Sequence, residues 1–146
     1  MTGTYLHNMD AKGRLFCSGQ LPEELGACFY VAVGANREAD GKLYQYLNLY
    51  PMKEWDRLCQ KLAELPSSKA AVSDTFFANA FKCEPDSQNR FMIPQKLRTY
   101  AGLEKEVAVV GNNNKAKIWN AEIWKAKDAE ALSGDHVADM MEMLGF

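Results

Sequence analysis

The sequence Asp10-Ala11-Lys12-Gly13-Arg14 returns later in the chain as Asp86-Ser87-Gln88-Asn89-Arg90. Each copy has Gly or Asn before its arginine, and these residue types tolerate a left-handed backbone best. Because strand-like alternation flanks both copies, each predicts a tight β-hairpin turn with a left-handed residue before the returning strand. An aspartate at the start of such a turn can accept hydrogen bonds from nearby backbone amides. The arginine that ends each turn is therefore expected at a fixed place on a hairpin tip.

The repetition extends well beyond the two turns. A constant separation of 76 residues relates Asp10 to Asp86, and a separation of 69 relates Trp55 to Trp124. The first half therefore carries seven extra residues, within the stretch 34–48. Two copies are too few for a solenoid, which needs three or more repeats. The duplication predicts two halves packed on each other.

Length and composition are those of an ordinary globular protein. The chain has 146 residues, 47% of them hydrophobic, which fits one domain or two closely packed halves. We place the halves at residues 1–65 and 66–146, the second including a linking helix and an acidic helical tail. No apolar run approaches the roughly 20 residues that span a bilayer, and residues 1–10 do not resemble a signal peptide. We expect no membrane association and a cytoplasmic location.

The charge distribution gives only weak support for nucleic-acid binding. The net charge is −2, but residues 120–146 contain two lysines and six acids. The rest of the chain is therefore slightly basic, so the acidic tail could lie away from a basic working face.

The four cysteines show no close pairing in the sequence. We expect them to be reduced thiols in the core, neither disulfides nor zinc ligands: Cys17, Cys28, Cys59 and Cys83.

Periodicity predicts the same order of elements in both halves. The expected strands are residues 5–9, 15–17, 28–33, 43–50, 81–84, 90–93, 106–111 and 115–119. The expected helices are residues 20–25, 51–65, 68–79, 94–100, 121–132 and 135–144, with Pro51 at the first helical position and Ser67-Ser68 and Asn120 as caps. Residues 35–41 are expected to form a polar loop. The last helix carries Met140, Met141, Met143 and Leu144, which form either a packing stripe or an adaptable contact surface, and we favour packing.

The residues of the second half support a resemblance to a known superfamily. The segment from Asp86 to Leu103 closely resembles the AbrB-like swapped-hairpin signature. Two such halves on one chain, with Leu49-Tyr50-Pro51-Met52-Lys53-Glu54-Trp55 between them, resemble the MraZ family over about residues 4–124. The resemblance implies an α+β fold in which tandem AbrB-like halves form an intramolecular pseudo-dimer. The implied architecture is a double-split β-barrel with surrounding helices.

The same resemblance implies a function. It indicates a sequence-specific transcriptional regulator of the bacterial division and cell-wall gene cluster, associated with the nucleoid. Such a protein would form a ring-shaped homo-oligomer and bind short direct repeats of double-stranded DNA near its own promoter. By position, Arg14 would be the principal DNA contact and Arg90 its counterpart in the second copy.

Several further residues are candidates for the DNA interface. Arginine suits such a site because its planar fork can bind a phosphate or the O6 and N7 atoms of guanine bidentately. The alternative is that each aspartate and arginine form only a local surface salt bridge, which contributes little. The two turns also differ, since Asn89, Gln88 and Pro22 stand where their counterparts are Gly13, Lys12 and Arg98. The other candidates are the turn aspartates Asp10 and Asp86 and the nearby possible phosphate contacts Lys12, His7, Lys82, Lys96 and Arg98.

Catalysis is the main rival class of function. The two histidines, His7 and His136, have no carboxylate or cysteine at the spacing of a metal site or catalytic triad. The chain has no glycine-rich phosphate loop and no GxSxG motif. We therefore expect no enzyme activity, no metal, no cofactor and no small-molecule ligand. A purely structural ring with protein partners remains the second alternative.

Overall fold

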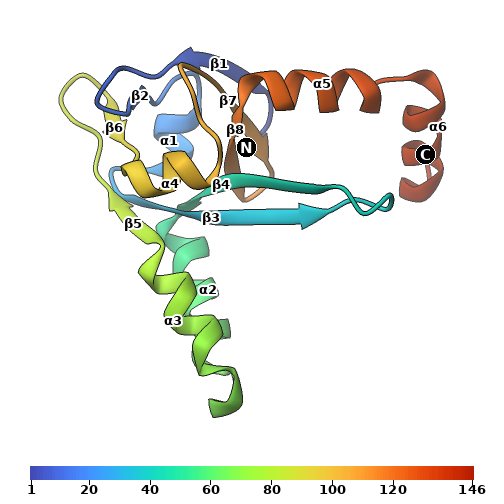
Figure 1. The fold of residues 1–146 in the computed structure, drawn as a ribbon. Helices are drawn as coiled ribbons and strands as arrows, with labels where there is room; N and C mark the ends of the chain where they lie inside the picture. Colours follow the sequence, from blue (N-terminus) through green and yellow to red (C-terminus); the bar gives the residue numbers. More distant parts are fainter.

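Both halves of the chain contribute strands to one large antiparallel sheet, in which one strand of each half pairs with a hairpin of the other. The computed structural model describes all of residues 1–146, and Figure 1 shows the sheet with helices projecting from it. The order across the sheet is β1-β7-β8-β4-β3-β5. These strands are β1 (Thr4–Asn8), β7 (Glu106–Asn112), β8 (Lys115–Asn120), β4 (Leu43–Pro51), β3 (Phe29–Arg37) and β5 (Ala80–Cys83).

A separate two-stranded ribbon is formed by β2 (Arg14–Phe16) and β6 (Arg90–Met92). The ribbon contributes Leu15 and Phe91 to the main core, where both are almost fully buried. The inner faces of β3, β4, β7 and β8 supply half of the remaining core residues, because their apolar residues alternate with a period of two. The fold is therefore α+β, with two separate sheets packed around one core. The hydrogen bonds between strands do not join the two sheets into one closed barrel.

The two halves exchange strands, which corrects the expectation of local hairpins. β1 pairs with β7, β5 pairs with β3, and β2 pairs with β6, so neither turn joins two strands that pair with each other. Alternation in the sequence identifies the buried face of a strand but does not identify its hydrogen-bonding partner. The pairing across the halves is what makes one chain a pseudo-dimer.

A pseudo-twofold axis passes through both sheets. In the ribbon, exchanging the halves converts the pair Arg14–Met92 into Arg90–Phe16 and leaves Leu15–Phe91 in place. In the large sheet, the same exchange leaves the pair Asn48–Lys117 in place. The two self-equivalent pairs mark where the axis crosses each sheet, so the ribbon is centred on the symmetry of the duplication.

Short helices cover the core, and longer ones form two arms. α1 (Leu21–Leu25) and α4 (Gln95–Tyr100) bury Leu21, Leu25 and Leu97. The first arm consists of α2 (Met52–Ala63), the 3₁₀ helix η1 (Ser67–Lys69) and α3 (Ala70–Ala78), and the second consists of α5 (Ala121–Ala131) and α6 (Gly134–Leu144). Figure 1 shows that the arms leave the sheet in different directions. None of the helices combines the length and the apolar composition that a bilayer-spanning segment requires.

The seven extra residues of the first half lengthen two strands. β3 continues to Arg37 and pairs with β4 as far as Leu43, so the expected loop at residues 35–41 is reduced to a tight turn at residues 38–42. The polar composition of the segment favoured a loop, but a polar segment can also form an exposed hairpin. Its backbone groups are hydrogen-bonded by strand pairing, and an exposed hairpin needs no apolar face. The extension reaches toward α5 in Figure 1.

Several local expectations change in the structure. Pro51 is the last residue of β4 and precedes the first residue of α2, and neither Ser67 nor Ser68 caps a helix with its side chain. The cap at Asn120 is confirmed, since its side chain accepts a hydrogen bond from the backbone nitrogen of Ile123 at 3.1 Å. The expected core thiols are buried only at Cys17 and Cys83, and Cys28 and Cys59 are half-buried.

The methionines of α6 do not form the expected packing stripe. Met140, Met141, Met143 and Leu144 are all exposed, and α6 buries no residue. Helix periodicity predicted one apolar face correctly, but no other element of the chain covers that face. The α5–α6 arm therefore leaves an apolar helix face open to solvent.

Candidate nucleic-acid interface

The first turn is built by the carboxylate of Asp10. Its Oδ1 atom accepts hydrogen bonds from the backbone nitrogens of Lys12 and Arg14, each at 2.9 Å. Its Oδ2 atom accepts a hydrogen bond from Arg14 Nε at 2.6 Å. Gly13 has φ of 80°, as the sequence predicts for the residue before the returning strand. Arg14 is thus anchored at both its backbone and its side chain.

The second turn repeats this geometry with different residues. Asp86 Oδ1 accepts from the backbone nitrogens of Gln88 and Arg90 at 2.9 and 3.0 Å, and Asp86 Oδ2 accepts from Arg90 Nε at 3.2 Å. Asn89 has φ of 62° and takes the left-handed position that Gly13 takes in the first turn. The predicted turn chemistry is confirmed in both copies.

The local salt bridge and an outward-facing arginine coexist in each turn. Only Nε of Arg14 and of Arg90 bonds to the aspartate, and the terminal Nη atoms make no hydrogen bond within the chain. The hydrogen bonds from the backbone and from Arg14 hold the pKa of Asp10 below its usual value, and Asp86 has a lowered pKa for the same reasons with Arg90. Each carboxylate therefore remains ionised and orients its arginine near neutral pH.

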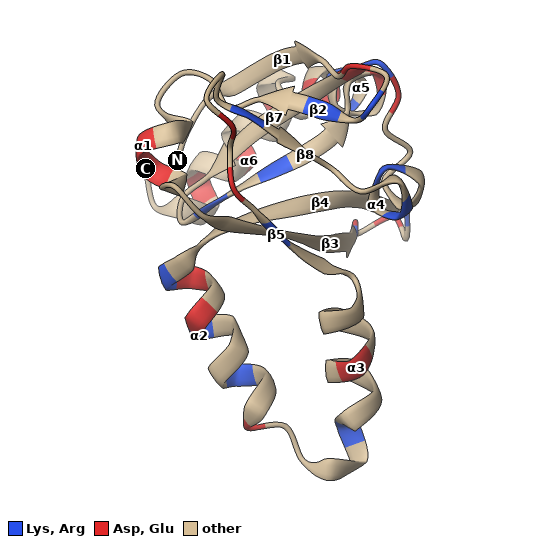
Figure 2. Cartoon of the chain, turned by 90° about the vertical axis from the view of Figure 1, so that its left-hand side faces the viewer, with Lys and Arg blue, Asp and Glu red and all other residues tan.

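Both arginines stand on the outer face of the β2–β6 ribbon. Leu15 and Phe91 point into the core, so the residues on either side of them point outward. Arg14 lies opposite Met92, and Arg90 lies opposite Phe16. Figure 2 is turned so that the ribbon side of the molecule, at the left in Figure 1, faces the viewer. The tertiary structure therefore brings the two duplicated arginines onto one two-stranded surface.

Each turn is held by the other half of the chain. The carbonyl oxygen of Gly13 accepts a hydrogen bond from Ile93 N at 2.9 Å, and that of Asn89 accepts one from Cys17 N at 2.9 Å. Ile93 and Cys17 follow β6 and β2, so these bonds extend the ribbon by one step at each end. Strand exchange thus fixes the positions of both arginines.

The other predicted contacts are divided between the ribbon and the large sheet. Lys12 is exposed at the first turn, Lys96 is exposed on α4, and Arg98 lies under the first turn with Nε bonded to Ile93 O at 2.9 Å. Lys82 is on β5, where Nζ lies 3.5 Å from Glu84 Oε1. His7 is on β1, where its Nε2 lies 2.5 Å from Ser18 Oγ, and burial lowers its pKa. The structure does not bring Lys82 and His7 onto the ribbon.

Sequence reasoning missed two residues on the ribbon. Phe16 is 51% exposed and Met92 is 58% exposed, although both are large and apolar. The signal was available, since an inward Leu15 and Phe91 require outward neighbours on such short strands. Their importance depends on the pairing of β2 with β6, which the sequence did not indicate.

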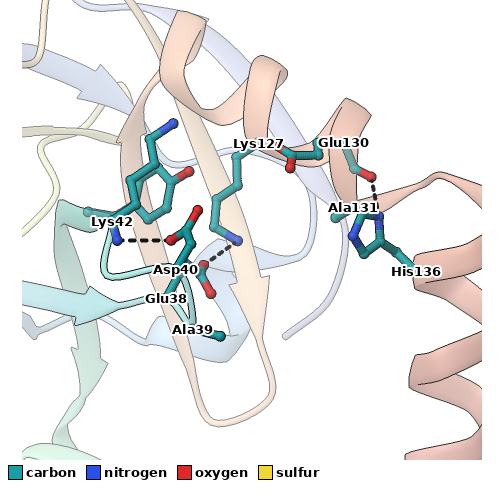
Figure 3. A pocket seen from close by; sticks show the side chains of 9 residues that line it. Glu38, Ala39, Asp40, Lys42, Lys127, Glu130, Ala131 and His136 are labelled. Atoms are coloured by element: carbon teal, nitrogen blue, oxygen red, sulfur yellow. Dashed lines mark hydrogen bonds and ion pairs between the residues drawn. The ribbon is translucent and has the colours of Figure 1, made fainter.

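A pocket elsewhere lies between the extended β3–β4 hairpin and the α5–α6 arm, with a volume of about 360 Å³. Figure 3 shows its charged lining. The lining groups bond to one another: Lys127 Nζ lies 3.1 Å from Glu38 Oε1, and His136 Nδ1 lies 3.0 Å from the carbonyl oxygen of Glu130. No group of three or more His, Cys, Asp or Glu residues is arranged to hold a metal ion. The pocket is therefore a weaker candidate site than the ribbon.

The fold and the ribbon together define a class of protein, one in which duplicated halves exchange strands and present paired arginine turns. The family model described as "MraZ protein, putative antitoxin-like" matches the chain twice, over residues 1–75 and 76–144. The chain belongs to the MraZ family.

Curated relatives align with this chain over most or nearly all of its length. The chain is 40% identical to "Transcriptional regulator MraZ" of Caldicellulosiruptor bescii over 149 aligned positions, covering 99% of each chain. It is 39% identical to the protein of the same name from Heliobacterium modesticaldum, covering 95% of this chain and 94% of the relative. A third relative of that name, from Carboxydothermus hydrogenoformans, is 41% identical over 84% of this chain and 82% of its own. The family assignment therefore rests on both halves together.

Proposed function

We propose that this chain is a DNA-binding transcriptional regulator that contacts double-stranded DNA through the outer face of the β2–β6 ribbon. The observation that supports this proposal most directly is the equivalent pair Arg14 and Arg90, each oriented by an aspartate and each with free Nη atoms. The names of the curated relatives support the regulatory role. On this proposal the chain is not an enzyme, and it acts in the cytoplasm at the nucleoid.

The geometry suits recognition of base edges. Fixing Nε on a carboxylate reduces the freedom that a long arginine side chain would lose on binding. The free Nη atoms can then reach a guanine O6/N7 edge or a phosphate. Lys12 and Lys96 are placed to add phosphate contacts, with Arg98 supporting the first turn. Asp10 and Asp86 act by orienting arginine, and His7 and Lys82 would contribute only at the periphery of the DNA.

The assembly follows from the pseudo-dimer. The two halves, residues 1–65 and 66–146, already use their strand-exchange surfaces on each other. Chains would then associate head to tail through different patches, and such contacts can close into a ring. The open apolar face of α6 supports an association surface of this kind. Head-to-tail neighbours face DNA in the same sense, so the proposed target is a set of direct repeats near the promoter of the chain's own gene in the division and cell-wall cluster.

A gel-shift experiment tests the arginines. The probe is the DNA upstream of the gene, or a duplex selected by the protein from a random library. We expect a salt-sensitive shift, with Arg14→Ala losing roughly 1–3 kcal/mol for each base contact removed. Arg90→Ala should lose less, because Gln88 replaces the cation that Lys12 supplies in the first turn.

The matched control is Arg57→Ala, which removes an exposed arginine paired with Glu54 on α2. It should leave the shift unchanged. Unchanged affinity in both Arg14→Ala and Arg90→Ala would refute the proposed interface. If the wild-type protein forms a ring but shifts no DNA even at low salt, the structural-ring alternative is correct.

The arrangement of repeats tests the head-to-tail assembly. Repeats that present the same face of the DNA should recur at about one helical turn, roughly 10–10.5 bp. Inserting five base pairs between two repeats moves one to the opposite face, so linked binding should weaken toward that of a single repeat. An inverted pair that binds as well as a direct pair would contradict the model.

A further inference from the structure

Two exposed apolar side chains are set among the arginines of the ribbon. Phe16 and Met92 lie on the outer face of β2 and β6, with about half of each side chain open to solvent. Single exposed apolar residues are common on protein surfaces. These two differ because they occupy a six-residue ribbon whose other outward side chains are Arg14 and Arg90.

The register pairs each apolar residue with an arginine from the other half. Met92 lies directly opposite Arg14, and Phe16 lies directly opposite Arg90. Residues directly opposite across antiparallel strands have Cβ atoms about 4.5–5.5 Å apart. The outer face therefore carries two arginine–apolar pairs, related by the pseudo-twofold axis.

This pairing matches the chemistry of the DNA major groove. The groove is about 12 Å wide and admits a two-stranded β-ribbon, and the thymine C5-methyl is the apolar group that it displays beside the hydrogen-bonding edges. We propose that Phe16 and Met92 are specificity-determining residues that contact thymine methyl groups next to the positions read by Arg90 and Arg14. This inference rests on the proposed function and identifies a base-specific component of the same interface.

Contact with a second copy explains the two residues less well. Two ribbons packed face to face would bring the free Nη atoms of Arg14 and Arg90 of both copies together, and the outer face of the facing ribbon would offer these donors only arginine, phenylalanine and methionine side chains. DNA supplies the opposite charge, because the backbone phosphates surround the groove. A polyanion with apolar methyl groups is thus the better match for this surface.

The test removes a single methyl group from the DNA. A duplex selected by the wild-type protein from a random library is prepared with each thymine in its footprint replaced in turn by deoxyuridine, which lacks only the C5-methyl. We expect wild-type affinity to fall roughly fourfold at one or more positions, the value of one buried methyl-sized group. Phe16→Ala and Met92→Ala should each bind the thymine duplex more weakly and lose the difference between thymine and deoxyuridine at one position.

The control is Leu43→Ala, which removes an equally exposed leucine from β4. It should keep the wild-type sensitivity to deoxyuridine. Wild-type binding that is equal for thymine and deoxyuridine at every position would overturn the inference. So would variants Phe16→Ala and Met92→Ala that both keep the wild-type difference between thymine and deoxyuridine. Either result would leave the proposed arginine interface intact. Sedimentation of Phe16→Ala and Met92→Ala should match the wild type, and a smaller assembly in either would show that the residue contacts another copy. If no duplex is selected at all, the proposed function itself fails.

Discussion

Each arginine turn lies next to a backbone carbonyl group at an equivalent position, and the two carbonyls accept hydrogen bonds from different kinds of donor. Ile93 and Cys17 occupy equivalent positions after the ribbon strands. The carbonyl oxygen of Ile93 accepts from Arg98 Nε, while that of Cys17 accepts from Asn89 Nδ2, each at 2.9 Å. Near the first turn, the donor Arg98 lies on α4, in the same half of the chain as Ile93. In the second turn, the donor Asn89 lies in the turn itself, in the other half from Cys17.

The comparison explains two differences that look unrelated in the sequence. A Cβ atom at Gly13 would lie 2.6 Å from Arg98 Nε, so the first turn needs glycine where arginine packs beneath it. In the second turn the residue equivalent to Arg98 is Pro22, which has no side-chain donor, and Asn89 supplies one. The Gly–Arg pair and the Asn–Pro pair are alternative solutions to one requirement, that a buried or half-buried carbonyl be hydrogen-bonded. Exchanging one member of a pair should therefore cost more than exchanging both.

Gly13→Asn should have the largest effect on stability. The new Cβ would lie 2.6 Å from Arg98 Nε and 2.9 Å from the carbonyl oxygen of Ile93, so we expect a loss of about 1–3 kcal/mol from overpacking. Urea unfolding measures this loss. The double variant Gly13→Asn with Arg98→Ala should recover part of it, because the new Asn can donate to Ile93 O as Asn89 does to Cys17 O. Strictly additive losses would show that the two pairs are not alternatives.

Substitution of Asn89 should have an intermediate effect. Asn89→Gly keeps the left-handed backbone at φ of 62° but loses the bond to Cys17 O, so a net loss of about 0.5–1.5 kcal/mol is expected. Asn89→Val loses the same bond and adds the strain of a β-branched residue in this conformation, so it should melt at a lower temperature than Asn89→Gly. Melting temperatures compare the two variants. Equal values for Gly and Val would contradict the described turn.

The two aspartates should give the smallest and most similar effects. The pKa of Asp10 and of Asp86 is lowered in the folded state, so each stabilises the fold above the unfolded value of about 3.9, and this contribution is lost as the pH falls through the folded pKa. The difference in unfolding midpoint between wild type and Asp10→Asn should therefore be larger at pH 7 than at pH 3. Asp86→Asn is the internal comparison and should follow the same pH dependence. A difference that grows on acidification would contradict the assigned shifts.

The arms show that duplication of sequence does not preserve packing. One aromatic contact is shared by the two arms, since Trp55 lies 6.3 Å from Tyr50 and the equivalent Trp124 lies 5.4 Å from Trp119 between ring centroids. Only Trp55 also stacks on a residue of β3, Tyr30, at 4.1 Å, because Glu106 stands at the position equivalent to Tyr30.

The lengthened β3–β4 hairpin lies beside the α5–α6 arm, where Lys127 bonds to Glu38. The β7–β8 hairpin contacts the first arm in the same way, since Asn114 Nδ2 donates to Glu54 Oε2 on α2 at 3.0 Å. The insertion in the first half therefore lengthens one of two equivalent hairpin–arm contacts.

The sequence by itself determined the turns and the order of the elements. The left-handed positions of Gly13 and Asn89, the capping of α5 by Asn120 and the two-half plan all follow from short-range chemistry. Such features depend on the φ preferences and hydrogen-bonding groups of residues close together in the chain. For the same reason, the anchoring of Arg14 and Arg90 by aspartates four residues earlier could be anticipated.

Only the tertiary structure decided which strands pair and what the ribbon displays. Alternation showed that Leu15 and Phe91 are buried but could not show that they face each other across the pseudo-twofold axis. The placement of Phe16 and Met92 beside the arginines follows from that pairing, as does the packing of Arg98 under Gly13. These contacts join residues more than 70 positions apart, and backbone hydrogen bonding is nearly independent of side-chain identity, so local sequence carries no record of the partner strand.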